Sequence, residues 1–283
     1  MVYPTPVLEN KEHSNQSVTL PLLGSGNFGE VHRAMIENRL VAVKTVRDET
    51  TFQRERNILQ GLSHQNVIKL IDSGLRNNSN VLVLELLDSD LLTLIRSNWL
   101  RLSDHQMVKV ALQVAQGMSY LISKGIIHRD LACRNVLIKR NQTDIEDVKI
   151  CDFGLSVLLS PGELEVVCKE KYDTRISAPE AISSHLFSQK SDVWSFGMLL
   201  YELFSRGHQI SAEQILSQKE VSAFPKGAMD LIRSCLEVNP NARPSFSEIC
   251  KNLSTIQENC GHTCSFVPPP VSYKLAPQTC DYV

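Results

Sequence analysis

The sequence predicts an α+β protein of two lobes, a small β-rich lobe followed by a larger helical one. Two observations carry this prediction. From Thr19 to about Ile95, short apolar runs alternate as they do in strands and are separated by glycine and polar residues. From Ser103 onward, the apolar residues recur at steps of three and four, which is the period of a helix.

The β-rich lobe is expected to span residues 18–87 and to hold five strands and one helix. The strands are expected at Thr19–Gly24, Glu30–Ile36, Leu40–Val46, Val67–Asp72 and Val81–Leu86. The helix is expected from Phe52 to Leu62, because the apolar residues of that stretch follow the helical period.

The helical lobe is expected to span residues 88–258. Its longest helix is predicted to begin after Ser103, a residue type that caps helix N-termini. Further helices are expected at Asp192–Phe204, Met229–Leu236 and Ser245–Ile256. Residues 1–17 are expected to form a polar leader, and residues 259–283, which contain three consecutive prolines, a flexible tail.

The composition is that of an ordinary globular protein. Of the 283 residues, 42% are hydrophobic and 21% charged, and a net charge of -2 gives no electrostatic basis for a nucleic-acid partner. No run approaches the ~20 apolar residues of a membrane-spanning helix. The eight cysteines lack the spacing of a zinc site or disulfide scaffold, and the N-terminus lacks a signal-peptide core. We therefore expect free thiols and a cytoplasmic protein, while the composition indicates no particular oligomeric state.

A glycine-rich motif lies between the first two expected strands. Gly24, Gly26 and Gly29 form the pattern GxGxxGxV, which ends at Val31. Glycine lets a backbone approach phosphate oxygens and present amide hydrogens without a side-chain clash. A dinucleotide-binding turn would be followed by a helix, whereas a strand is expected here. The motif therefore favours a phosphate-covering loop between two strands.

A lysine and a glutamate downstream form a candidate ion pair. Lys44 ends an alternating strand segment, from which it can reach phosphates. Taken alone, such a residue is as well explained as a surface lysine on an edge strand. Glu55 lies in the following helix and is the expected carboxylate partner, while the competing Glu49 lies outside the helical period.

The segment from His128 to Asn135, HRDLACRN, holds the next set of candidates. Asp130 is a carboxylate that can accept or orient the proton of an attacking hydroxyl. Asn135 supplies a neutral oxygen, and Asp152, in an Asp-Phe-Gly sequence, supplies a charged one. Oxygen ligands are those that a hard cation such as Mg²⁺ prefers. The ordered occurrence of all these motifs predicts phosphoryl transfer.

The sequence from about Val18 to Ile256 resembles the eukaryotic protein kinase domain, and in particular the non-receptor branch of the protein tyrosine kinases. Serine/threonine kinases usually carry a lysine two residues after the catalytic aspartate. Here that position is Ala132 and the cation is Arg134, as in tyrosine kinases, and the Ser191–Gly197 sequence is similarly typical of them. The resemblance implies a bilobal protein kinase fold, ATP with Mg²⁺ or Mn²⁺ as cofactors, and tyrosine-bearing proteins as substrates.

The resemblance also implies a role for each matched residue. The expected catalytic residues are Lys44, Glu55, Asp130 and Arg134, and the expected metal ligands are Asn135 and Asp152. In this arrangement Asp130 positions the tyrosine hydroxyl and Arg134 offsets charge on the transferring phosphoryl group. The nucleotide would be bound by Lys44 together with Leu23, Gly24, Ser25, Gly26, Asn27, Phe28, Gly29, Val31, Ala42, Glu85, Leu87 and Leu137.

Other matched residues are expected to be structural. Asp192 would bind the backbone of the catalytic loop, and Glu180 and Arg243 would form a buried ion pair. Cys151 is expected at the back of the nucleotide pocket as a small, inert filler, and Leu84 at the entrance to the rear of that pocket.

The segment after Asp152 departs from the tyrosine kinase pattern. Leu164 stands where those enzymes usually carry an autophosphorylated tyrosine, which leaves Arg129 without its usual phosphate partner. One hypothesis is that Glu163 or Glu165 takes the place of the phosphate. The alternative is a solvated acidic loop, since exposed ion pairs contribute little.

The expected acceptor platform departs from the pattern as well. Asp173 and Ile176 stand where tyrosine kinases normally have proline and tryptophan. An aspartate there would favour basic residues near the acceptor or weaken tyrosine recognition. Two alternatives to a tyrosine kinase therefore stay open, a serine/threonine or dual-specificity kinase and a non-enzymatic pseudokinase scaffold.

Overall fold

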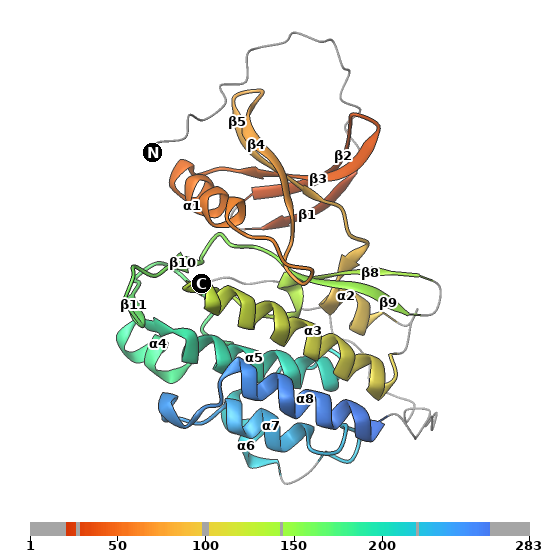
Figure 1. Ribbon diagram of the computed structural model, residues 1–283, viewed down its shortest axis with the longest axis vertical. Coiled ribbons are helices and arrows are strands. Elements are labelled where there is room, and N and C mark those ends of the chain that lie inside the picture. The colour runs from red at the N-terminus through yellow and green to blue at the C-terminus, as the bar shows by residue number, and fades with distance from the viewer. Residues whose placement is uncertain (1–20, 27–28, 98–101, 142–143, 219–220, 261–283) are drawn as a thin grey trace.

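The structure, a computed structural model of the 283-residue chain, is described for residues 21–26, 29–97, 102–141, 144–218 and 221–260. Figure 1 shows a part built on a β-sheet above a larger part built of helices. The predicted α+β class is therefore confirmed. A cleft lined by residues of both parts separates them.

The upper part is a five-stranded antiparallel sheet in the order β1-β2-β3-β5-β4. Its strands are β1 (Leu22–Gly26), β2 (Gly29–Ile36), β3 (Arg39–Val46), β4 (Leu70–Arg76) and β5 (Ser79–Glu85). Strand β4 overlaps the predicted Val67–Asp72 strand but begins later, at Leu70, and Val67 instead forms an isolated bridge with Ile150. Residues 19–20, where the first strand was expected to start, lie outside the described residues.

Helix α1 (Glu49–Gln60) lies beside this sheet and begins earlier than predicted. The Asp48 carboxylate caps it by accepting a hydrogen bond from a backbone N–H of the first turn at 2.6 Å. Placing Glu49 outside the helix was therefore wrong. Its carboxylate accepts hydrogen bonds from Gln53 and Asn80 at 2.7 and 2.6 Å, so it does not compete for the lysine of β3.

The lower part is built around long helices, which the sequence predicted. They are α3 (Asp104–Ser123), α5 (Gln189–Phe204), α7 (Ala228–Cys235) and α8 (Phe246–Cys260). Ser103 caps α3 as expected, in a capping box with Gln106. Helix α3 packs against α5 and α8. Helix α8 continues to Cys260, past the predicted end of the lobe at residue 258.

The remaining elements are short and were not predicted. The helices are α2 (Leu91–Arg96), α4 (Pro179–Ser184) and α6 (Ala212–Ser217), with 3-10 turns at Cys133–Asn135 and Pro240–Ala242. The strands are β6 (Ser89–Asp90), β7 (Ile126–Ile127), β8 (Val136–Arg140), β9 (Ile145–Ile150), β10 (Val157–Leu158), β11 (Glu165–Val167) and β12 (Leu186–Ser188). The paired strands β8 and β9 matter most for the site, because they connect Asn135 to Asp152.

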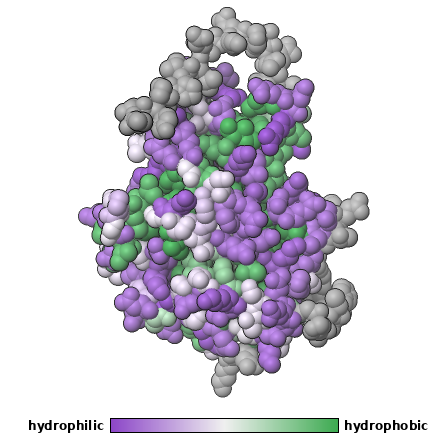
Figure 2. All heavy atoms as spheres, viewed as in Figure 1, coloured by the Kyte–Doolittle hydropathy of each residue, from purple (hydrophilic) through white to green (hydrophobic). Residues whose placement is uncertain are grey.

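One cluster of buried apolar residues runs through both parts. It joins Leu82 of the sheet to Met118 of α3 and Phe196 of α5. On the face in Figure 2, hydrophilic residues cover most of the surface. Within the residues that the structure describes, no helix combines the length and apolarity needed to cross a lipid bilayer.

A buried ion pair joins α4 to the segment before α8, as predicted. Arg243 donates from Nη1 and Nη2 to the two carboxylate oxygens of Glu180 at 2.6 and 2.8 Å. The Arg243 side chain is fully buried and lies over the Trp194 ring, 5.1 Å from its centroid. Removing the carboxylate would leave a guanidinium charge without its partner in the interior.

We therefore expect Glu180→Ala to lower the free energy of unfolding by about 3–5 kcal/mol. Urea denaturation measures this change. Asp230→Ala is the matched control, because it removes an ion-paired carboxylate whose side chain is 85% exposed. That control is expected to cost no more than about 1 kcal/mol. Equal effects of the two substitutions would contradict a structural role for the buried pair.

Candidate active site

The cleft between the sheet and the helices has a volume of about 2090 Å³. The predicted site residues that line it are Leu23, Gly24, Ser25, Gly29, Val31, Ala42, Lys44, Glu55, Glu85, Leu87, Asp130, Arg134, Asn135, Leu137 and Asp152. Gly26 lies at the end of β1, and Asn27 and Phe28 lie outside the described residues. The cleft exceeds the usual ~300–1,000 Å³ of a small-molecule site, so it has room for a nucleotide and part of a second substrate.

The glycines of the β1–β2 turn serve different purposes. A Cβ added at Gly24 would meet nothing within 4 Å, so the absence of a side chain there leaves room for a ligand. A Cβ added at Gly29 would lie 1.6 Å from the carbonyl oxygen of Thr45 in β3. Gly29 also has a φ of 145°, which L-residues rarely adopt. Gly29 is therefore required by strand packing.

Lys44 of β3 lies between two carboxylates. Its Nζ donates to both oxygens of Glu55 at 2.8 Å and to Oδ1 of Asp152 at 2.8 Å. The expected ion pair of Lys44 with Glu55 is confirmed. The contact with Asp152 was not predicted, because nothing in the sequence shows that residues 44 and 152 are neighbours.

The three charges of this group perturb one another. Burial opposes the ammonium form of Lys44, but the Asp152 and Glu55 carboxylates outweigh it and raise the lysine pKa. Burial raises the pKa of Glu55 despite the nearby ammonium. It opposes ionisation of Asp152 too, but Lys44 holds the pKa of that carboxyl below its ordinary value. One ammonium faces two carboxylates, so the site can accept a further positive charge.

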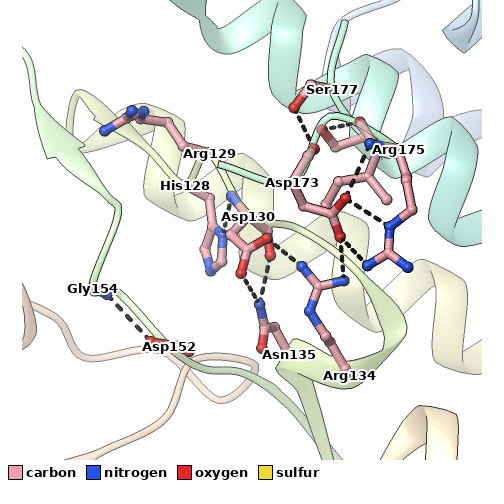
Figure 3. A network of polar contacts seen from close by, with 12 residues as sticks. His128, Arg129, Asp130, Arg134, Asn135, Asp152, Gly154, Asp173, Arg175 and Ser177 are labelled. Carbon is pink, nitrogen blue, oxygen red and sulfur yellow. Dashed lines mark hydrogen bonds and ion pairs between the residues drawn. The ribbon is translucent and has the colours of Figure 1, made fainter. Parts of the chain in front are cut away.

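The catalytic-loop candidates form a second group, shown in Figure 3. Arg134 Nη2 donates to Oδ1 of Asp130 at 2.5 Å. The Asn135 amide nitrogen donates to Oδ2 and to the backbone carbonyl of Asp130, both at 2.7 Å. Both carboxylate oxygens of Asp130 are therefore oriented by donors on the turn that follows it.

The backbone of this loop is held by Asp192 of α5. The Asp192 carboxylate accepts from the backbone N–H groups of His128 and Arg129 at 2.7 and 2.9 Å, as predicted. Arg129 has a φ of 68°, a costly conformation for a residue with a side chain. Burial lowers the pKa of His128, so its imidazole is neutral. Its Nε2 donates to the carbonyl of Cys151 at 3.1 Å, which ties the loop to the start of the Asp-Phe-Gly sequence.

The pKa of Asp130 lies in the range that suits its predicted role as a general base. Burial raises its pKa to about 6, although Arg134 opposes the shift. A carboxylate with a pKa near the working pH accepts a proton better than one at its ordinary value. The oriented carboxylate and its raised pKa therefore both fit the predicted role of Asp130.

The pKa of Asp130 predicts the acid side of the pH–rate profile. The base must be ionised, so kcat/KM is expected to be nearly full from about one pH unit above the Asp130 pKa of about 6, to be half its maximum at that pH, and to fall further below it. Initial rates between pH 5 and 8, with circular dichroism to verify folding, measure this. A profile that stays flat down to pH 5 would contradict the assignment.

Asn135 and Asp152 fit the binding of a hard cation. The Asn135 amide nitrogen is engaged with Asp130, which leaves its oxygen for another contact. Asp152 accepts hydrogen bonds on Oδ1 from Lys44 Nζ and from the backbone N–H of Gly154. An amide oxygen and a carboxylate oxygen are suitable ligands for Mg²⁺, which takes the rest of its shell from phosphate and water. No cluster of three or more His, Cys, Asp or Glu side chains suited to a metal occurs in the same ranges.

The residues predicted to surround the adenine, and Cys151, also line the cleft. Leu84 and Cys151 line it. The Glu85 carboxylate accepts from the backbone N–H of Lys69 at 2.8 Å and pairs with Lys149, and the Glu85 backbone N–H donates to the carbonyl of Lys69 at 3.1 Å, so the side chain and the N–H are both engaged in structure. Burial raises the pKa of Cys151 well above its ordinary value, in agreement with an inert thiol.

Asp173 is bound by two arginines, which the sequence did not reveal. Arg134 Nη1 approaches Oδ2 of Asp173 at 3.2 Å, and Arg175 donates from Nε and Nη2 at 2.9 and 2.8 Å. Figure 3 shows Arg134 between Asp130 and Asp173. Asp173 is partly buried, but these arginines hold its pKa below the ordinary value. Its charge is thus already offset, which weakens the idea that it selects basic substrates.

The partner of Arg129 differs from the two that the sequence suggested. Glu163 accepts from the backbone N–H of Ser160 at 2.9 Å, and Glu165 lies in β11. Arg129 instead pairs with Glu170 at 3.0 Å. The hypothesis that Glu163 or Glu165 binds Arg129 is therefore wrong. Glu170 follows strand β11, at the point where the chain comes back to Arg129. The pattern of apolar residues in the sequence did not indicate this course of the chain.

The sequence was compared with protein families and with individual known proteins. Residues 18–253 match the family described as protein tyrosine and serine/threonine kinase. Human tyrosine-protein kinase Fer is 36% identical over 264 residues, which cover 86% of this chain and 32% of Fer. Tyrosine-protein kinase hopscotch of Drosophila melanogaster is 35% identical over 254 residues (81% and 21%), and mouse protein-tyrosine kinase 6 is 34% identical over 273 (89% and 59%). The chain spans about a third of the length of Fer.

Proposed function

This chain belongs to the protein tyrosine and serine/threonine kinase family, and from that premise we propose that it transfers the γ-phosphate of ATP to tyrosine hydroxyls of protein substrates. The observation that carries the proposal is convergence. Lys44, Asp130 and Asp152 come from three separate segments and line one cleft. A scaffold without activity would have no need to keep all three charged groups together.

The choice of tyrosine rests on Arg134 and on the relatives. Arg134 lines the cleft beside Asp130, in the position that the tyrosine kinase resemblance assigns to the phosphate-contacting cation. The relatives reported above are named tyrosine kinases. Asp173 and Ile176, at the expected acceptor platform, are the residues that a serine/threonine alternative would rest on.

In the proposed mechanism each residue acts on a defined charge. ATP with Mg²⁺ supplies the phosphoryl group and a cation that offsets its charge, and Asn135 and Asp152 would hold the metal. Lys44, fixed by Glu55, would bind phosphate oxygens. Asp130, oriented by its two donors, would position the acceptor hydroxyl and take its proton.

The charge of Arg134 would favour the transition state. Its side chain is 30% exposed in the cleft. Its two terminal nitrogens pair with different carboxylates, Nη2 with Asp130 and Nη1 with Asp173. A guanidinium fixed before the reaction costs no reorganisation when negative charge develops on the phosphoryl oxygens. Catalysis in this site would therefore be chiefly positioning and electrostatic stabilisation.

The domain limits and the cell compartment are parts of the same proposal. We assign the kinase domain to residues 18–260, with the smaller lobe at 18–87 and the larger at 88–260, so that it includes the whole of α8. The proposal includes a cytoplasmic location, Mg²⁺ or Mn²⁺ as the cation and tyrosine-bearing proteins as partners, and membership of the kinase family and similarity to Fer support it.

A peptide array with γ-labelled ATP tests the proposal. The purified chain is expected to label tyrosine-containing peptides when Mg²⁺ is present and to stop when EDTA removes it. Label on serine or threonine peptides alone would show that the chain is a serine/threonine kinase and not a tyrosine kinase. Nucleotide binding without any transfer would indicate a scaffold.

A further inference from the structure

Three segments that are far apart in the sequence meet at the side chain of Glu170. Arg54 of α1 donates to its carboxylate from Nη1 at 3.0 Å and from Nη2 at 2.5 Å. Arg129, the neighbour of Asp130, donates from Nη1 to Oε2 at 3.0 Å. Glu170 itself belongs to the segment that follows Asp152. We call this cluster of Arg54, Arg129 and Glu170 the Glu170 junction.

Both arginines of the junction also bind the backbone just after Asp152. Arg54 Nη1 donates to the carbonyl of Gly154 at 3.2 Å. Arg129 Nη1 donates to the carbonyl of Leu155 at 2.9 Å. The junction therefore fixes the course of the chain where it leaves the candidate metal ligand.

The charge balance of the junction depends on the carboxylate. The Arg129 side chain is fully buried and lies over the Phe187 ring, 4.4 Å from its centroid. Its Nε and Nη2 have no hydrogen-bond partner among the described residues, so its ion pair with Glu170 is needed to offset the cost of burying the charge. Hydrogen bonds from Arg54 and then Arg129 hold the pKa of Glu170 below its ordinary value, which keeps it ionised at neutral pH.

The junction sits next to both halves of the active site. Arg54 precedes Glu55, whose carboxylate holds Lys44. Arg129 precedes Asp130, and Figure 3 shows the two side chains pointing in different directions. A displacement of α1 would therefore separate the Lys44 ion pair, and a displacement of the loop would move the base.

We propose that Glu170 is a positioning residue that holds α1 and the catalytic loop in the active arrangement without modification of the segment. The inference rests on the proposed kinase activity and specifies its regulation: the chain is active as synthesised. A carboxylate carries a smaller charge than a phosphate, but two guanidinium groups and two backbone carbonyls already converge here.

The test compares the same substitution at three glutamates of one segment. Glu170→Gln is expected to lower kcat by about tenfold or more, since it removes hydrogen bonds between charged groups. Glu163→Gln and Glu165→Gln are the matched controls and are expected to match the wild type. Glu170→Asp, which keeps the charge, is expected to recover part of the loss. Phosphatase-treated wild type is expected to be fully active without a lag.

Hydrogen exchange of α1 without ATP separates this inference from the proposed function. Amides of residues 49–60 are expected to exchange faster in Glu170→Gln than in Glu165→Gln. If the wild type transfers no phosphate, the kinase proposal fails, and the exchange contrast alone decides the junction. Equal exchange and equal kcat in these two variants would overturn the inference. Loss of most wild-type activity after phosphatase treatment would also overturn it.

Discussion

Replacing Asp130 with asparagine is expected to lower kcat for phosphoryl transfer by about 10²- to 10⁴-fold, the usual contribution of a positioned general base. The amide cannot take the proton of the acceptor hydroxyl. It also disturbs the loop, because both oxygens of Asp130 accept hydrogen bonds, from Arg134 and from Asn135. An NH₂ group in place of either oxygen would face a donor.

Asp144→Asn is the control for this substitution. Asp144 is also ion-paired, to Lys109 at 2.9 Å, but it is not among the residues that line the cleft. Steady-state rates with saturating ATP and peptide, beside thermal unfolding of each variant, measure the contrast. If Asp130→Asn kept near-normal kcat, Asp130 would not be the base.

Lys44→Met is expected to lower kcat by about 10²-fold or more, in the range found when one preorganised donor to developing charge is removed. The structure adds an electrostatic reason. Lys44 holds down the pKa of the partly buried Asp152 carboxylate, so loss of the ammonium is expected to raise that pKa and favour the protonated form. A protonated Asp152 is a poor ligand for Mg²⁺.

Lys109→Met is the matched control, since Lys109 is ion-paired to Asp144 away from the cleft. It should leave kcat and the dependence on Mg²⁺ near the wild-type values. For Lys44→Met we expect a higher Mg²⁺ requirement as well as a lower kcat. Titration of the rate with Mg²⁺ at fixed ATP measures both. An unchanged Mg²⁺ requirement together with a normal rate would refute the role of Lys44.

The long elements and the site residues could be predicted because each has a local signal. The apolar period of α3 and the cap at Ser103 are properties of adjacent residues. The motifs around Gly24, Lys44 and Asp130 occur in a recognisable order and spacing. That pattern was enough to predict one shared site, and all three residues line the same cleft. The resemblance to the protein kinase family implied the Lys44–Glu55 pair and the Glu180–Arg243 pair, and both are present.

What the sequence could not predict depends on contacts between distant residues. The start of β4 at Leu70 is set by pairing with β5, and periodicity alone placed it too early. The contact of Arg134 with Asp173 and that of Arg129 with Glu170 join residues 39 and 41 positions apart, across a segment built of several short strands. Several carboxylates in that segment were equally plausible partners, and only its three-dimensional course distinguishes them.

The most direct test of the central claim is phosphoamino-acid analysis of a mixed peptide library containing serine, threonine and tyrosine. The wild-type chain, Mg²⁺ and γ-labelled ATP would be incubated with the library beside the Asp130→Asn variant. A tyrosine kinase using this cleft is predicted to place the label on phosphotyrosine, and the variant to place almost none. Label on phosphoserine or phosphothreonine, or equal labelling by the variant, would contradict it.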